Sequence, residues 1–133
     1  MSIKNLLVPI LFLMTIAGSV TAVSAQEWVK LGSQKANHKA EHDTIMVMDW
    51  KTAFTKIKLT VADAPVHFYR LRIVFGNGTE EVQLPDVIPA GGESRVIELG
   101  KSGRFIRQVD FWYESASLGG KKAKVTLYGM PFR

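Results

Sequence analysis

Arg-Phe-Ile-Arg-Gln-Val-Asp-Phe-Trp-Tyr-Glu, residues 104–114, is the stretch of sequence that decides the expected fold. Its bulky apolar side chains are separated by one step of three residues and then by two steps of two: Ile106, Val109, Phe111 and Tyr113. Steps of two keep side chains on one face of a β-strand, and a step of three shifts the phase as a bulge or corner does. The segment is therefore predicted to be a strand with one buried face and one irregularity.

Two other segments repeat this spacing. The first contains Phe54, Ile57, Leu59 and Val61, and the second contains Phe68, Leu71, Ile73 and Phe75. We interpret all three as the central strands of one antiparallel β-domain. Gly76-Asn77-Gly78 then supplies the positive-φ residues of a tight hairpin, so residues 79–84 are expected to return as the partner of the second segment.

The remaining strands are shorter and are expected to close over these three. They are predicted at 27–31, 44–50, 94–99 and 123–130. The segment 44–50 is mostly apolar, as in a strand covered on both faces, although Trp50 at its end also fits a position at the rim. Residues 33–43 are predicted to form a polar loop that holds at most a turn of helix, and residues 85–93 a long connection.

About eight strands at this spacing, with no amphipathic helical segment, indicate an all-β fold. The first prediction is an antiparallel β-sandwich of jelly-roll type. An immunoglobulin-like sandwich is the second and a small closed barrel the third. Alternation assigns residues to faces and does not determine which strands are neighbours.

The first 25 residues have the features of an export signal. Lys4 precedes an apolar run over residues 6–17, and small residues lead to Val23-Ser24-Ala25. Cleavage is predicted after Ala25, which leaves residues 26–133 as a single domain in the periplasm or outside the cell. A retained anchor is the alternative, but the apolar run is short for a span of about 20 residues, so no transmembrane segment is expected after cleavage.

Composition limits the kinds of site. The chain has no cysteine, which excludes disulfides, thiolate metal sites and a lipidated cysteine. The mature chain retains sixteen basic and twelve acidic residues, a net charge of +4. This modest excess favours contact with polyanions at low salt but specifies no partner. Nucleic acid is not expected, because the protein is predicted to be exported and its charge is not concentrated in one run.

Several turn and core motifs together resemble a known family. They are Trp28 with Leu31-Gly32, Asp43, the Gly-x-Ser-Arg of residues 92–95, Leu99-Gly100, the repeat at 104–113, and Val125-x-Leu127-x-Gly129. In these the chain is similar to the YaaI-type family of small exported bacterial proteins of unknown function. The resemblance covers nearly all of the mature chain. It implies a periplasmic β-sandwich and brings no catalytic residue with it.

The sharpest chemical motif is His38-Lys39-Ala40-Glu41-His42, which matches the H-x-x-E-H pattern of inverted zinc peptidases. In that chemistry two histidines one helical turn apart hold zinc, and the glutamate activates water. Here the motif lies between two predicted strands, so a solvated polar loop is the favoured interpretation. His38, His42 and Asp43 are only weak metal candidates, with His67 as another source of a third ligand. No catalytic residue and no cofactor are predicted.

Surface recognition is the remaining class of function. The residues expected on polar faces of the strands are Trp50, Trp112, Tyr128, Arg70, Arg72 and Arg107. Aromatic faces can stack on sugar rings, and arginines suit phosphate or carboxylate groups. The favoured alternatives are that the aromatic side chains belong to the core and that the arginines form a solvated face. In that face the expected cross-strand partners are Glu98, Asp110 and Glu114.

Three classes of function follow from the sequence. The first prediction is a non-catalytic module of the cell envelope that binds glycan, an anionic lipid headgroup or protein. The second is a docking, assembly or stress accessory protein that acts through an exposed strand edge. The third is a metal-dependent hydrolase built on His38, Glu41 and His42. A concave aromatic groove would favour the first class, and a bare hydrophobic edge strand the second.

Overall fold

The structure is a computed structural model and describes residues 27–37, 41–115 and 120–133. The predicted export signal and its cleavage position after Ala25 lie outside these residues, as does His38. The described residues form only strands and their connections. The strands are β1 (Val29–Lys35), β2 (His42–Met46), β3 (Ala53–Ala62), β4 (Val66–Phe75), β5 (Gly78–Gln83), β6 (Val87–Ile88), β7 (Ile97–Glu98), β8 (Arg104–Ser115) and β9 (Lys124–Pro131).

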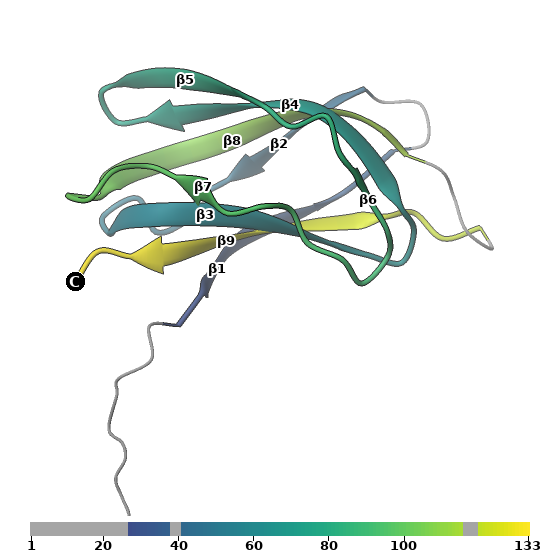
Figure 1. The fold of residues 1–133 in the computed structure, drawn as a ribbon, viewed down its shortest axis with the longest axis horizontal. Coiled ribbons are helices and arrows are strands. Elements are labelled where there is room, and N and C mark those ends of the chain that lie inside the picture. The colour runs from purple at the N-terminus through teal and green to yellow at the C-terminus, as the bar shows by residue number, and fades with distance from the viewer. Residues whose placement is uncertain (1–26, 38–40, 116–119) are drawn as a thin grey trace, which may run out of the picture.

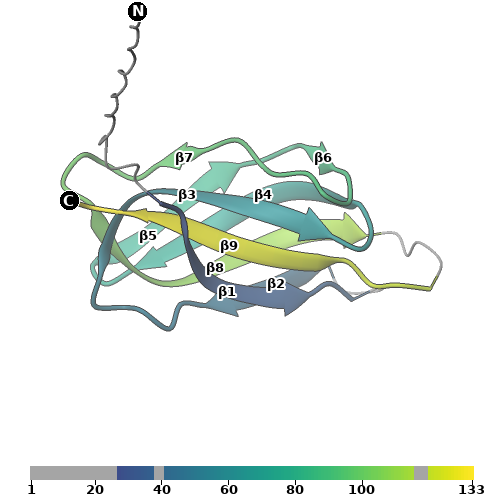
Figure 2. The same cartoon turned by 90° about the horizontal axis from the view of Figure 1, so that it is seen from below.

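The strands pack as two antiparallel layers (Figures 1 and 2). One layer has the order β1-β9-β3-β7, and the other has the order β2-β8-β4-β5, with β6 beside the start of β4. The first two residues of β8 pair with β3 before the strand joins β4, so β8 links the layers at one end. This is the strand order of a jelly roll, which confirms the first fold prediction over the immunoglobulin-like and barrel alternatives.

All three phase-shifted rows are buried between the layers, as predicted. Each step of three residues coincides with a bulge, because one residue in each strand has no partner in the neighbouring ladder. These residues are Thr55 in β3, Tyr69 in β4 and Arg107 in β8. The extra residue moves the next apolar side chain back to the core face, so the unequal spacing in sequence keeps a single buried face.

The hairpin is also confirmed. β4 and β5 pair up to Phe75 opposite Gly78, which leaves Gly76 and Asn77 as the two turn residues. Of the three residues expected to supply positive φ, only Gly78 does so, at φ +148°.

The shorter strands differ from the prediction in four respects. β1 does not stop at Gly32 but continues to Lys35, so part of the predicted loop is strand. β2 starts at His42 and alternates between buried Ile45 and exposed Met46, so it is not covered on both faces. β6 is an extra short strand within the predicted connection. The predicted strand 94–99 is reduced to the two residues of β7.

Gly32 and the buried Ser94 explain two of these differences. A Cβ on Gly32 would lie 2.8 Å from both the Ile45 Cγ2 atom and the Met46 carbonyl oxygen, so glycine lets β1 pass close over β2 without breaking the strand. The Ser94 hydroxyl accepts a hydrogen bond from the Leu59 amide at 2.8 Å and donates one to the Arg95 carbonyl at 2.8 Å. These side-chain bonds hold 94–96 beside β3 in place of a regular ladder.

Candidate binding surfaces

The outer face of the β2-β8-β4-β5 layer carries two aligned rows of polar and aromatic side chains. In the first row, His42 of β2, Trp112 of β8 and Arg70 of β4 are register partners. In the second row, Thr44, Asp110 and Arg72 occupy the same three strands. Cross-strand partners stand side by side on one face, so the pairing brings together residues far apart in the sequence. We call these six residues the outer-face cluster.

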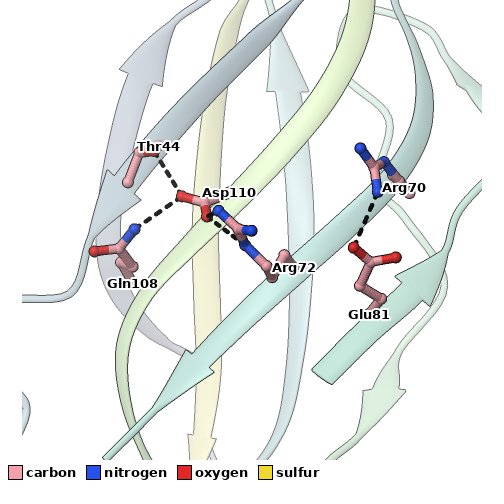
Figure 3. A network of polar contacts seen from close by, with 6 residues as sticks. All are labelled: Thr44, Arg70, Arg72, Glu81, Gln108 and Asp110. Atoms are coloured by element: carbon pink, nitrogen blue, oxygen red, sulfur yellow. Dashed lines mark hydrogen bonds and ion pairs between the residues drawn. The ribbon is translucent and has the colours of Figure 1, made fainter. Parts of the chain in front are cut away.

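Asp110 is the centre of this cluster (Figure 3) and only 1% of it is exposed. One carboxylate oxygen accepts hydrogen bonds from the Thr44 hydroxyl at 2.6 Å and the Gln108 amide at 2.9 Å. The other accepts from Nε of Arg72 at 3.0 Å and lies 2.8 Å from its Nη2. A carboxylate on an outward face is therefore buried entirely by its neighbours, and both of its oxygens are occupied.

The ionisation of Asp110 follows from these contacts. Burial raises its pKa, because it disfavours the charged form. The hydrogen bonds from Thr44, Arg72 and Gln108, with the charge of Arg72, outweigh burial and place the pKa below the ordinary value of 3.8. Asp110 is thus a fixed anion at neutral pH that holds Arg72 in place.

Trp112 is packed between side chains of the two neighbouring strands. The His42 ring is stacked on it with 4.5 Å between ring centroids and 13° between planes. The Arg70 guanidinium lies 3.9 Å from the ring centroid on the side of β4. Because β2 and β4 flank β8 on opposite sides, His42 and Arg70 cover the two ring faces. Trp112 therefore offers a ligand its edge and no open platform for a sugar ring.

The arginines of this face have carboxylate partners. Asp110 pairs with Arg72 as expected, and Arg70 lies 2.9 Å from Glu81 of β5 (Figure 3), a partner that the sequence interpretation missed. In the β4–β5 register Glu81 is opposite Arg72, so its pair with Arg70 is a diagonal one that the register alone does not indicate. Of the other expected partners, Glu114 accepts a hydrogen bond from Tyr69 at 2.7 Å. The favoured prediction of a solvated face with cross-strand pairs fits this arrangement.

A pocket lies at the end of the sandwich where β8 crosses between the layers. It has a volume of about 330 Å³ and is lined by Trp50, Lys51, Gly76, Phe105 and Arg107. Trp50 and Lys51 come from the β2–β3 connection, Gly76 from the β4–β5 turn, and Phe105 and Arg107 from the start of β8. We call this the end pocket.

Backbone hydrogen bonds hold the three segments of the end pocket together. The Gly76 amide donates to the Phe105 carbonyl at 3.0 Å, and the Val47 amide donates to the Arg107 carbonyl at 3.0 Å. Trp50 is 59% and Phe105 52% exposed, so both aromatic side chains are accessible. The Lys51 ammonium lies 5.3 Å from the Trp50 ring centroid. The pocket therefore combines accessible aromatic surface with two exposed cations, a pairing that suits an anion attached to an apolar or ring-shaped group.

The six predicted surface residues are thus divided among three places. Trp50 and Arg107 share the end pocket, and Trp112, Arg70 and Arg72 belong to the outer-face cluster. Tyr128 is on β9 in the other layer, where its register partners are Lys30 and Lys58. The sequence interpretation missed Lys51 and Phe105. Phe105 had a signal, since it is a large apolar residue outside the buried row of its own strand.

The proposed zinc motif lies partly outside the described residues, because His38 does. The described Glu41 and His42 are exposed, and His42 is the first residue of β2, so these two are not on a helix. Asp43 accepts a hydrogen bond from the Tyr113 hydroxyl at 2.7 Å. Within residues 27–37, 41–115 and 120–133, no group of three or more His, Asp or Glu side chains is arranged to hold a metal ion.

Tyr113 is the largest fully buried side chain of the described core, and its hydroxyl ties β8 to the edge of the sandwich. Besides donating to Asp43, it accepts a hydrogen bond from the Asn37 amide at 2.9 Å. Burial first and the hydrogen bond to Asp43 second raise the pKa of Tyr113 to about 12. The hydroxyl is therefore a neutral structural group at physiological pH, and the Asp43 carboxylate is engaged by it.

The β5 edge gives little support for docking by strand addition. β5 forms one edge of its layer and exposes Glu80 and Glu81. Charges on an edge strand oppose pairing with another chain. In the part of the chain that the structure describes, no helix is long and apolar enough to cross a membrane.

Fold and surfaces together define a small β-sandwich of jelly-roll order with a pocket at one end. A comparison with protein families identifies the family of the chain. The family model described as "Domain of unknown function (DUF2541)" matches residues 6–129, and the chain belongs to this family. A search of curated proteins gives no match. The family description names no activity, so functional inference rests on the geometry of the surfaces.

Proposed function

We propose that this protein is an exported, non-catalytic binding module of the cell envelope, and that its ligand joins a negatively charged group to an apolar part. The observation that carries this proposal is the end pocket, where accessible Trp50 and Phe105 lie beside exposed Lys51 and Arg107. The outer-face cluster is less suited to a ligand, because its arginines face carboxylates and the faces of Trp112 are covered.

Export is supported by the sequence of the first 25 residues, with cleavage after Ala25 and a periplasmic or secreted product. Within its family, we place the chain with the YaaI-type proteins on the motifs quoted above. Of the ligand classes considered from sequence, an anionic headgroup fits the end pocket better than a neutral glycan, since two cations line it.

Titration with a soluble ligand of this chemistry tests the proposal. Short-chain phosphatidylglycerol, kept below its micelle concentration, is added to the mature isotope-labelled protein while amide shifts are followed by NMR. We expect saturable shifts centred on the end pocket and none with short-chain phosphatidylcholine.

The matched variants are the doubles Lys51→Gln/Arg107→Gln and Lys121→Gln/Lys122→Gln. Both remove two exposed positive charges. Lys121 and Lys122 belong to the segment before β9, which lies at the end of the sandwich opposite the end pocket (Figure 1). Loss of the shifts in the first variant alone supports the proposal. Shifts elsewhere on the surface, or equal binding by both variants, would refute it.

A further inference from the structure

Several exposed apolar side chains lie at the end of the sandwich that contains the end pocket. Nine large apolar residues are exposed in the part of the chain that the structure describes, and five of them lie at this end: Met46, Met48, Trp50, Phe105 and Phe132. Met48 is 83% exposed. The Phe132 amide donates to the Ala53 carbonyl at 2.8 Å, which places the last aromatic residue beside the start of β3. A cluster of this kind marks an interaction surface, whereas single exposed apolar residues are ordinary.

Exposed basic side chains lie at the same end of the sandwich. Lys51 and Arg107 are exposed at the pocket, and Lys101 is exposed in the turn that leads into β8. Arg104 lies nearby but already pairs with Glu80 at 3.4 Å. The acidic Asp49 accepts a hydrogen bond from Thr52 at 2.7 Å. The local excess is therefore positive, and it complements an anionic surface.

We infer that this end of the sandwich docks on the surface of an anionic lipid bilayer, an inference that rests on the proposed function and names its partner. Trp50 and Phe105 enter the interfacial region, where aromatic rings are favoured, and Met48 inserts beside them. Lys51 and Arg107 remain at the level of the lipid phosphates. The pocket between the aromatic residues accepts part of one lipid molecule.

The depth of contact is shallow. Met48 and Trp50 come from the β2–β3 connection and Phe105 from the start of β8, so they are held by the β-scaffold and do not form a spanning segment. Binding is therefore reversible and depends on both apolar burial and charge. Each basic residue near an anionic surface contributes about a fivefold increase in affinity, so Lys51 and Arg107 together account for about 25-fold.

Vesicle co-sedimentation tests this inference with the mature protein. The vesicles are phosphatidylcholine with or without phosphatidylglycerol, at low and high salt. We expect binding to the anionic vesicles only, weakened by salt. Lys51→Gln/Arg107→Gln should bind about 25-fold more weakly, while Lys121→Gln/Lys122→Gln should match the unsubstituted protein. Trp50→Ala should lose about tenfold or more.

A second measurement reports the position of Trp50. Phospholipids brominated on the acyl chain should quench fluorescence of the unsubstituted protein, and Trp50→Phe should remove the quenched component. The four variants alter exposed side chains, and circular dichroism verifies their fold. Quenching that persists without Trp50, or vesicle binding that is unaffected by both the aromatic and the basic substitutions, would overturn the inference.

The two proposals fail separately. Binding of soluble phosphatidylglycerol without binding to vesicles refutes membrane docking and leaves the proposed function standing. Absence of both refutes both. Displacement of the protein from vesicles by a soluble acidic oligosaccharide that shifts the end-pocket resonances would instead identify a glycan as the partner and overturn the inference.

Discussion

Asp110 allows the sharpest test of how the outer-face cluster stabilises the fold. The perturbation is Asp110→Asn, which preserves shape and removes the charge. Asparagine retains one acceptor oxygen and replaces the other with an NH₂ donor. Its oxygen can stay with the two nitrogens of Arg72, which have no acceptor. Its NH₂ group then faces Thr44 and Gln108, so the Thr44 hydroxyl must accept instead of donate and the Gln108 amide must turn its oxygen toward it.

The expected magnitude follows from the charge that this substitution removes from the four contacts. Hydrogen bonds to a charged group contribute about 1.5–3 kcal/mol each and neutral ones about 0.5–1.5 kcal/mol, so each contact loses about 1 kcal/mol. Arg72 is 43% exposed, so water replaces part of what its guanidinium loses. We therefore expect the free energy of unfolding to fall by about 2–4 kcal/mol, below the full effect of breaking a deeply buried ion pair.

Urea denaturation at neutral pH measures this change, with Glu81→Gln as the matched control. Glu81 also pairs with an arginine of β4, but its side chain is 49% exposed, and its loss should cost less than about 1 kcal/mol. A double-mutant cycle with Arg72→Gln should give a coupling energy of about 1–3 kcal/mol. If Asp110→Asn and Glu81→Gln lower the free energy of unfolding by the same amount, burial of the Asp110 carboxylate does not strengthen its contribution to stability.

The pH dependence gives an independent check of the same reasoning. The pKa of Asp110 is lower in the folded protein than its ordinary value of 3.8. Its contribution is therefore complete above pH 3.8 and is lost as the pH falls through the lower folded-state value. The difference in stability between the unsubstituted protein and Asp110→Asn should shrink over this range. A difference that stays constant would contradict the assigned pKa shift.

Two further predictions concern the core. Tyr113→Phe should cost about 1–3 kcal/mol, because the Asp43 carboxylate loses its hydroxyl donor. Since the pKa of Tyr113 is raised from 10 to about 12, this contribution is complete below pH 10 and disappears as the pH rises through 12. The difference in unfolding free energy between the unsubstituted protein and Tyr113→Phe, measured in urea, should therefore be smaller at pH 11 than at pH 8. Equal differences at the two pH values would refute this. Gly129→Ala should cost about 1–3 kcal/mol in thermal unfolding, because its Cβ would lie 2.7 Å from the Phe54 ring. Gly76→Ala, with no atom within 4 Å, should leave stability nearly unchanged, and equal losses would contradict the packing argument.

The buried rows could be predicted from the sequence because alternation reports faces directly. Ile106, Val109, Phe111 and Tyr113 are buried in β8, and the step of three marks the bulge at Arg107. Strand ends were predicted less well, since they depend on contacts between distant segments. The continuation of β1 through Gly32, for example, requires the close approach of β2, which no local pattern contains.

The candidate sites were predicted only in part for a related reason. Trp112 and Arg70 were each expected opposite the apolar row of their own strand. The stacking of the His42 ring on the indole, however, depends on β2 pairing with β8. The periodicity of the sequence does not reveal the strand order that creates this stack. Lys51 was missed because it lies in a connection, and its place beside Phe105 results from the crossing of β8 between layers.

The bulge in β8 connects the fold to the end pocket. Phe105 pairs with Ala53 in one layer, and Ile106 already pairs with Phe75 in the other. Arg107 is the extra residue of the second ladder, because Gln108 pairs with Val74, so the Arg107 side chain is exposed while Ile106 is buried in the core. If the strand alternated regularly from the buried Val109 back toward its start, residue 107 would be buried and Ile106 would be exposed. The bulge in β8 therefore also places an aromatic ring and a cation, Phe105 and Arg107, at the rim of the pocket.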